Sequence, residues 1–269
     1  MNSGKVLLVT AGVIGLGALA YFYDILHKRG KKKYIEFDKK VKELKTIREA
    51  NGTFSVQAVA KLVTFVSEES EKEFERSSKS LVRQRRKQLK EENYEDYLEI
   101  AQECFELQRE TEEEYLKRAL DKLGIERDEY EEELAKLPPQ TMQAIMANKG
   151  AAKSAENVAI PYSLTKAKTK EIFMEITSLQ QRSNEKWKPL FEKMEAKIAS
   201  MDQMTGGAVM MGIMQFLVTD ILYNEYKVSE EQYTAALQKH RIMEDPDIVR
   251  MMRQQAAMYQ MMMMMNGGQ

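Results

Sequence analysis

The side chains that could carry out covalent or metal chemistry are few in this 269-residue chain. There is one cysteine, Cys104, and there are two histidines, His27 and His240. A single cysteine excludes a disulfide within the chain and any zinc site built from cysteines, and two histidines are too few for the usual histidine-rich catalytic metal sites. We therefore predict no metal ion. Cys104 shares a helical face with apolar neighbours and is expected to be a small buried side chain.

Acid–base and phosphate chemistry also lack a recognisable motif. The acidic triplets at 112–114 and 131–133 are consecutive, so their side chains fan around a helix instead of converging on one point. Gly12, Gly15 and Gly17 lie inside an apolar segment, where they cannot cradle a phosphate. We predict a non-catalytic protein with no cofactor and no small-molecule substrate. A pair of carboxylates brought together only by the fold stays open as the enzyme alternative.

The first 27 residues predict an N-terminal membrane anchor. Residues 6–23 carry no charge, and a helix of that length spans about 27 Å, close to the thickness of the hydrocarbon core of a bilayer. A basic cluster follows, and its members are expected to contact lipid headgroups: Lys28, Arg29, Lys31, Lys32 and Lys33. Because positive residues resist translocation, we expect a single-pass protein with its C-terminal bulk on the cytoplasmic or matrix side. A mitochondrial membrane and the endoplasmic reticulum both fit.

Two other interpretations of this segment stay open. Lys5 and the sequence Ala18-Leu19-Ala20 fit a signal peptide that is cleaved after Ala20. A buried core helix of a soluble protein is also apolar over such a length. The sequon that begins at Asn51 separates the topologies, because it is glycosylated only if the bulk of the chain is lumenal.

Small residues gather on one side of the predicted anchor. Ala11, Gly15 and Ala18 share a helical face, with Gly12 beside them. Small side chains at this spacing let another helix approach closely, so this face is a candidate for packing against a partner helix in the membrane. The alternative explanation is that small residues are common in membrane helices in general.

The remainder of the chain predicts an all-α, multi-helix extramembrane region with long amphipathic helices. Few prolines and glycines interrupt it, and apolar residues recur at three-to-four spacing in long segments. The expected helices include residues 31–50, a segment capped by Thr53 or Ser55 that reaches Phe74, and residues 94–123, about 163–201 and 208–223. Shorter helices are expected after Ile125, after Pro138-Pro139 and after Val228, and a last one begins at Asp245-Pro246. Pro189 is expected to kink or break the helix over about 163–201, whose apolar positions approximate a coiled-coil heptad.

Short motifs predict where several helices begin or end. Gly124 fits the left-handed residue that follows a helix, with a hydrophobic contact from the residue after it. Ser229 and Gln232 fit a capping box at a helix start. The double glycine at 206–207 is expected to precede the apolar helix over 208–223, which Gln and Asp interrupt and which is therefore expected to be buried core.

Changes of composition predict two lobes and two charge poles. Residues 148–161 are rich in small and polar residues and predict a linker between a charged lobe over 28–147 and a methionine-rich lobe over 162–269. Within the first lobe, Lys and Arg dominate residues 28–90, and Asp and Glu dominate residues 91–137. We expect these two segments to face one another in an antiparallel hairpin, or one of them to meet an oppositely charged partner.

Most of the 19 methionines lie after residue 200. Flexible thioether side chains suit a groove that accepts varied apolar helices, and they also suit an ordinary adaptable core. The candidate groove residues are Met210, Met211, Met214, Met251 and Met252. Copper binding is disfavoured because no histidine or cysteine accompanies them.

Together these features predict a structural function. The formal net charge of −1 argues against a nucleic-acid-binding protein, which would be strongly basic. We expect a non-catalytic, membrane-anchored accessory subunit or scaffold that contacts membrane lipid and other protein subunits of a larger membrane complex. The alternative is a membrane-tethered receptor or adaptor that holds client helices in the methionine-rich groove.

Overall fold

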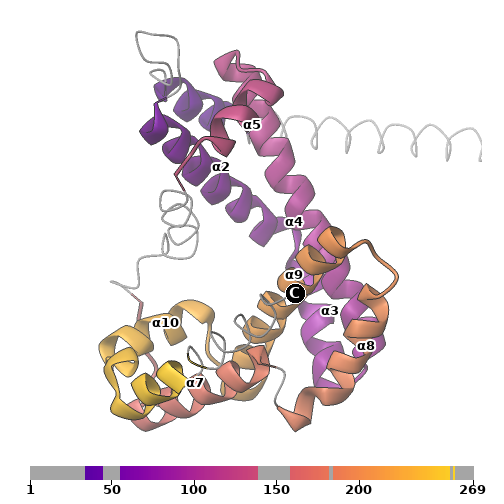
Figure 1. Ribbon diagram of the computed structural model, residues 1–269, viewed down its shortest axis with the longest axis vertical. Helices are drawn as coiled ribbons and strands as arrows, with labels where there is room; N and C mark the ends of the chain where they lie inside the picture. The colour runs from indigo at the N-terminus through magenta and orange to yellow at the C-terminus, as the bar shows by residue number, and fades with distance from the viewer. Residues whose placement is uncertain (1–33, 45–54, 139–157, 182–183, 255–256, 258–269) are drawn as a thin grey trace, which may run out of the picture. The chain divides into compact units, whose positions relative to one another are not determined.

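The computed structural model describes residues 34–44, 55–138, 158–181, 184–254 and 257. Throughout these ranges the regular secondary structure is helical and no strand occurs (Figure 1). The predicted all-α fold is therefore confirmed for this part of the chain. The predicted membrane anchor over residues 1–27 lies outside the described residues.

Contacts between residues divide the chain into two compact units. The first unit holds residues 1–73 and 111–149, and the second holds residues 74–110 and 150–269. Most of the predicted linker over 148–161 lies outside the described residues, so the arrangement of two lobes joined by it stays a prediction. Buried side chains from the segment 74–110 belong to the same hydrophobic cluster as those of the C-terminal helices.

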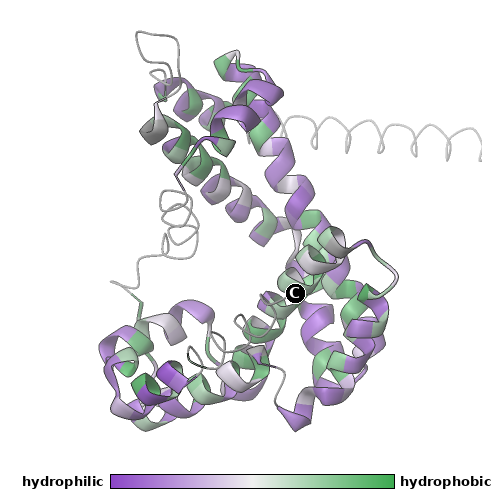
Figure 2. Ribbon diagram, viewed as in Figure 1, coloured by the Kyte–Doolittle hydropathy of each residue, from purple (hydrophilic) through white to green (hydrophobic). Residues whose placement is uncertain are grey.

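Aromatic packing forms the centre of the first unit. Its helices are residues 34–43, part of α2 (Val56–Ser77), the last part of α4 (Tyr94–Leu123) and α5 (Arg127–Ala135). The ring of Phe37 stacks on Phe65 at 5.1 Å between centroids and meets Tyr115 edge-on at 4.9 Å. Hydrophilic and hydrophobic residues alternate around α2 and α4 (Figure 2), the pattern of helices with one buried side.

Gly124 ends α4 as the sequence predicts. Its φ of +66° is left-handed, and its amide donates to the Asp121 carbonyl at 3.4 Å. The Ile125 amide donates to the Leu120 carbonyl at 3.1 Å. These are the two hydrogen bonds of a Schellman motif, and the side chains of Ile125 and Leu120 are buried in the same cluster. The predicted helix end is therefore confirmed in detail.

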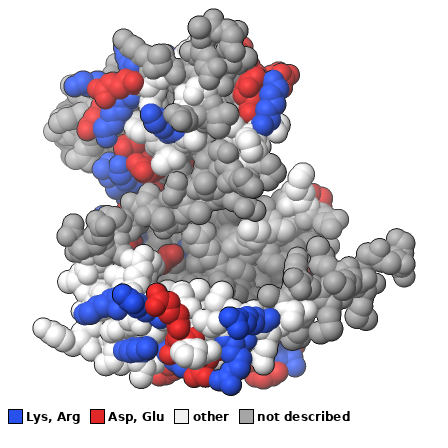
Figure 3. All heavy atoms as spheres, turned by 60° about the vertical axis from the view of Figure 1, so that its left-hand side comes forward, with Lys and Arg blue, Asp and Glu red and all other residues white. Residues whose placement is uncertain are grey.

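An ion pair joins the helix over 34–43 to α4. On the face drawn in Figure 3, basic and acidic side chains lie next to one another. Arg118 donates two hydrogen bonds to the Asp38 carboxylate, at 2.7 and 2.8 Å, and Lys122 lies 3.3 Å from the same group. The hydrogen bonds from Arg118 hold the pKa of Asp38 below its ordinary value, and they outweigh the raising effect of partial burial.

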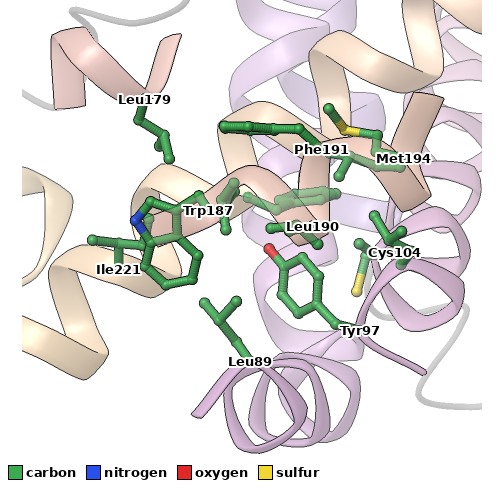
Figure 4. Packing of buried hydrophobic residues seen from close by; sticks show 14 of the residues in the cluster. Leu89, Tyr97, Cys104, Leu179, Trp187, Leu190, Phe191, Met194 and Ile221 are labelled. Atoms are coloured by element: carbon green, nitrogen blue, oxygen red, sulfur yellow. The ribbon is translucent and has the colours of Figure 1, made fainter. Parts of the chain in front are cut away.

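The second unit contains more helices, arranged around two hydrophobic clusters. Besides the first part of α4, they are α3 (Lys79–Lys90), α7 (Lys166–Gln180), η2 (Glu185–Trp187), α8 (Lys188–Ile198), α9 (Gln203–Ile221), η3 (Leu222–Tyr226), α10 (Glu230–Lys239), η4 (Ile242–Glu244) and the helical residues 246–254. The larger cluster joins α3, α4, α8 and α9, and Figure 4 shows its side chains gathered around Tyr97 and Trp187. The smaller cluster joins α7, η3 and α10.

The single long helix expected over residues 163–201 is in fact interrupted. The helix α7 ends at Gln180, and Asn184 begins the next turn by accepting a hydrogen bond from the Lys186 amide at 3.1 Å. Pro189 lies in the first turn of α8, where its missing N–H is tolerated. A continuous heptad helix is therefore wrong, and so is a break made by Pro189, because α7 ends nine residues before the proline, which lies in the first turn of the next helix.

The double glycine at 206–207 lies inside α9 rather than before it, which corrects the predicted start of this helix. Asp202 begins α9 by accepting a hydrogen bond from the Thr205 amide at 3.0 Å. Gly206 is buried, and a Cβ at this position would lie 2.7 Å from Cγ2 of Ile198. The missing side chain therefore permits a close contact with the end of α8, and the aspartate cap decides where the helix begins.

Two predicted helix starts in the C-terminal region are confirmed. The Ser229 hydroxyl accepts from the Gln232 amide at 3.2 Å, and the Gln232 side chain accepts from the Ser229 amide at 3.0 Å, which completes the capping box of α10. Asp245 accepts from the Asp247 amide at 3.1 Å ahead of the last helical segment. Both motifs involve only neighbouring residues, so the sequence contains all that they need.

Gly207 and Gly212 both lie in α9, but they differ in how much space surrounds them. A Cβ on Gly212 would lie 2.2 Å from Cδ2 of Phe105, whereas nothing lies within 4 Å of a Cβ on Gly207. We expect Gly207→Ala to raise the free energy of unfolding by up to about 1 kcal/mol, because alanine is the better helix former. Gly212→Ala should lower it by about 1–3 kcal/mol, because the Phe105 ring must move. Urea unfolding of the full chain in neutral detergent measures both changes, and a stabilising Gly212→Ala would contradict the close contact.

Asp38 should make the first unit sensitive to acid. Because its pKa is lowered in the folded state, its stabilising effect is present above the ordinary carboxyl pKa and is lost as the pH falls through the folded value. We expect Asp38→Asn to lower the melting temperature at neutral pH and to flatten its decline between neutral pH and about pH 3. Circular dichroism at several pH values measures this, with Asp121→Asn, an exposed carboxylate of α4, as the control. Superimposable profiles for the two variants would show that the ion pair contributes nothing.

Candidate functional site

A carboxylate lies buried in the core of the second unit. Asp220 belongs to the last turn of the apolar helix α9, and its side chain has no exposed surface. Removing a carboxylate from water is costly unless it is paired with a cation and hydrogen-bonded. The partners of Asp220 come from two consecutive residues of α3, Arg85 and Arg86.

Both oxygens of Asp220 are satisfied. Arg85 donates from Nε to Oδ2 at 2.5 Å and from Nη2 to Oδ1 at 3.1 Å. Arg86 donates from Nε to Oδ1 at 3.1 Å, and the Tyr97 hydroxyl lies 3.4 Å from Oδ2. The Arg85 guanidinium also lies 4.2 Å from the ring centre of Phe216. The arrangement ties α3 to α9 through a two-pronged ion pair that has both directional and electrostatic character.

The charges of this cluster do not cancel. Two guanidinium groups face one carboxylate, so the cluster of Arg85, Arg86 and Asp220 keeps an excess of one positive charge. The side chain of Arg85 is 3% exposed and that of Arg86 is 29% exposed. The excess charge therefore reaches the surface through Arg86, while Arg85 remains inside, where its Nη1 atom has no hydrogen-bond partner among the described residues.

Two titratable side chains, Tyr97 and Cys104, lie beside the cluster, and the pKa of each is raised above its ordinary value. Burial and the nearby charge of Asp220 raise the pKa of Tyr97 well above its ordinary value. Burial raises the pKa of the Cys104 thiol, although the charge of Arg85 opposes this. Cys104 is completely buried, which confirms the prediction of a small buried side chain. Burial disfavours the Arg85 cation, but hydrogen bonding to Asp220 outweighs this and raises its pKa. Burial thus favours the protonated forms of Tyr97 and Cys104, and hydrogen bonding favours the charged form of Arg85.

A row of cations on α3 lines a hollow beside this cluster. Arg83, Arg86, Lys87 and Lys90 follow the spacing of one helical face. The hollow has a volume of about 470 Å³, and it is completed by Glu91, Tyr223, Asn224 and Lys227. We call it the basic pocket, because Glu91 is the one carboxylate among these residues.

The π-helical turn η3 positions the second wall of the basic pocket. The Asn224 side chain donates to the Arg86 carbonyl at 2.9 Å, which fixes this turn against α3. The ring centre of Tyr223 lies 3.9 Å from the Arg86 guanidinium and 5.8 Å from Nζ of Lys227. The turn ends at Lys227 with a left-handed φ of 58°. Wide π-turns of this kind often occur at functional sites.

The helix that contains Asp220 resembles a membrane span in composition. Among the described residues, Met204–Tyr226 is the one helix long and apolar enough to cross a membrane, but 44% of its most apolar stretch is buried inside the chain. A core helix meets the same criteria of length and composition. The buried ion pair with Arg85 favours the core interpretation, since the apolar side of α9 that contains Asp220 packs against other helices.

The opposite side of α9 is exposed. Met204 and Met211 are 81% and 75% exposed, and Ala208 and Gln215 are exposed as well. These four positions follow the spacing of one helical stripe. We call it the exposed stripe of α9.

The predicted groove methionines lie in different environments. Met210 and Met214 are half-buried and pack against the larger hydrophobic cluster, whereas Met211 belongs to the exposed stripe of α9. Met251 is half-buried and Met252 is 42% exposed, and neither is part of the larger cluster. The structure thus brings two of the five together and places a third on the other side of the same helix.

The other predicted site residues are outside the described part of the chain. These are the small residues of the membrane segment and the basic residues after it, namely Ala11, Gly12, Gly15, Ala18, Lys28, Arg29, Lys31, Lys32 and Lys33. Their roles remain predictions. In the part of the chain with described side chains, no group of three or more His, Cys, Asp or Glu residues could hold a metal ion.

Sequence reasoning missed the pairing of Asp220 with Arg85 and Arg86. Asp220 lies 135 positions after Arg85 and 134 positions after Arg86. The charge pattern instead predicts that the basic residues of 28–90 face the acidic residues of 91–137. An aspartate within an apolar helix was the available signal, because such a residue needs a buried cation. The pattern did not reveal which of the many cations supplies it.

No protein-family model matches the chain, and neither the curated proteins nor the solved structures contain a match.

Asp220→Asn should leave the Arg85 charge without a counter-ion in the core. We expect this variant to lose about 3–5 kcal/mol of the free energy of unfolding. The double variant Arg85→Met/Asp220→Leu removes both buried charges and should recover most of that loss. Urea unfolding of the full chain in neutral detergent compares the two. A double variant as unstable as Asp220→Asn would show that packing at these positions, and not charge pairing, determines the stability.

Proposed function

We propose that the chain is a non-catalytic accessory or scaffold subunit of a membrane protein complex, held at the membrane by its apolar segment over residues 6–23. The length of that segment, its lack of charge and the basic cluster over 28–33 support the anchor. The extensive helical region supports a role in contacts with other proteins. Its buried polar groups serve to fix helices together, as in the pairing of Asp220 with Arg85.

The exposed stripe of α9 is the main structural observation that supports the scaffold function. Met204 and Met211 lie two turns apart with nearly their full surface open, while Ile213 and Leu217 of the same helix are buried. An apolar stripe that is open to solvent on a well-packed helix is suited to contact with another apolar surface. Methionine adapts its shape to such a contact. We take the occupant to be an apolar helix of a neighbouring subunit.

A membrane-tethered receptor or adaptor is the second candidate. Met243 and Met252, in the C-terminal region, are 48% and 42% exposed. Several separate methionine surfaces suit the capture of varied client helices better than one permanent contact. The two functions differ in the lifetime of the contact, because a subunit stays with its complex during purification and an adaptor exchanges its clients.

The scaffold function is tested by placing charges on the exposed stripe. We expect the full chain, extracted in mild detergent, to migrate within a large assembly on a native gel. Met204→Lys/Met211→Lys should release it as a lone chain, because lysine cannot be buried in an apolar contact without a large cost. The matched control is Ile35→Lys/Met174→Lys, which adds the same charge at two other exposed apolar residues and should leave the assembly intact.

Two results would contradict the scaffold function. A wild-type chain that migrates alone has no stable complex to belong to. Release from membranes by an alkaline wash would contradict the anchor. If varied proteins copurify instead, and Met243→Lys/Met252→Lys removes them while the stripe variant does not, the adaptor function is favoured.

A further inference from the structure

The basic pocket between α3 and η3 is unusual for its concentration of like charge. Four cations on one face of α3 and Lys227 on the facing turn surround it, against the single carboxylate of Glu91. Glu91 lies 3.9 Å from Lys87, and this is an exposed contact that solvent screens. Among the residues that the structure describes, neither Arg83 nor Lys90 forms an ion pair. The cationic side chains that line the pocket therefore repel one another unless an anion binds between them.

Contacts within the chain restrain Arg86 and Lys227, two of the cations of the pocket. Arg86 is held by Asp220 from the inside and by the ring of Tyr223 from the side. Its carbonyl accepts a hydrogen bond from Asn224, so backbone and side chain are both restrained. Lys227 donates to the Asn224 carbonyl at 2.8 Å. Restrained cations lose little conformational entropy when an anion binds, which favours affinity.

The buried cluster adds to the positive field at this surface. Asp220 neutralises one of its two guanidinium partners, and the remaining positive charge reaches the pocket through Arg86. Because Arg85 lies in the low-dielectric core, water screens its charge less than it screens an exposed lysine. The pocket thus combines two arginines, which have planar donors, with the ammonium groups of three lysines, a mixture that suits the oxygens of a phosphate.

We infer that the basic pocket binds a phosphate group, carried either by the headgroup of a membrane lipid or by a small soluble phosphate ester. A volume of about 470 Å³ accommodates a single phosphorylated headgroup or ester. A nucleic acid is a poorer fit, because the chain as a whole has a net charge of −1 and acidic side chains adjoin basic ones on the face drawn in Figure 3. The inference stands apart from the scaffold function, because it depends on α3 and η3 and not on the exposed stripe of α9.

The test uses the full chain in micelles of a neutral detergent. In one arm, inositol trisphosphate is titrated into the protein and the heat of binding is measured. In the other, the micelles contain phosphatidylinositol bisphosphate, with phosphatidylcholine as the neutral comparison, and binding is followed by the rise in melting temperature. We expect binding in at least one arm. Binding of the soluble ester with no stabilisation by the lipid assigns a small phosphate ester, and stabilisation by the lipid, with or without binding of the ester, assigns a headgroup.

A pair of matched variants locates the site. Lys87→Gln/Lys90→Gln removes two charges from the pocket and should weaken binding at least about tenfold, while the melting temperature of the free protein does not fall, because repulsion between the cations is relieved. Lys188→Gln/Lys239→Gln removes two charges from exposed lysines elsewhere in the second unit and should bind as the wild type does. Lys87→Arg/Lys90→Arg should retain binding, since it preserves the charge.

Three results would overturn the inference. The first is the absence of binding in both arms. The second is an equal loss in the pocket variant and in the Lys188→Gln/Lys239→Gln control, because the attraction would then be a general effect of charge. The third is tighter, pocket-dependent binding of an RNA oligonucleotide than of either phosphate ligand, which would assign the pocket to nucleic acid.

Discussion

The second unit depends on the pairing of one buried carboxylate with one buried guanidinium. The helix α3 is strongly polar, and among its residues only Arg85 and Leu89 are buried. Its apolar contacts alone offer little to hold it against α9. The bond between Arg85 and Asp220 supplies a contact that is directional, so it fixes the rotation of α3 about its axis as well as its position. Stacking of Arg85 on Phe216 adds an apolar component to the same contact.

That rotation determines which charges reach the surface. With Arg85 turned inward, a second face of α3 carries Arg83, Arg86, Lys87 and Lys90, the four cations of this helix that line the basic pocket. A buried anion therefore organises an exposed cationic pocket, because the helix is rigid between the two faces. Asn224 and Tyr223 complete the pocket from the turn that follows α9. The same helix, α9, thus supplies the buried carboxylate and leads into the turn that forms the pocket's other wall.

The features that the sequence could predict are those in which all participants are neighbours in the chain. Gly124 and the capping box at Ser229 are of this kind, and both occur as expected. The end of α7 was missed because Gln180 is followed by no proline or glycine, and the start of α9 was misplaced because Asp202 outweighs the glycines that follow. These errors concern boundaries, where tertiary contacts such as that of Gly206 with Ile198 compete with local preference.

The contact between α3 and α9 was beyond prediction for a different reason. Periodicity indicates which side of a helix is apolar, but Arg85 interrupts the pattern of its own helix and resembles a surface residue by type. Its burial is understandable only once Asp220 is known to need a cation, and the two are 135 positions apart.

Asp220 also bears on whether α9 is a core helix or a membrane span. Facing lipid, an aspartate would need a partner within the membrane or protonation. Here it lies among Arg85, Arg86 and Tyr97 in a packed core, so the apolar composition of α9 reflects burial on one side and the exposed stripe on the other.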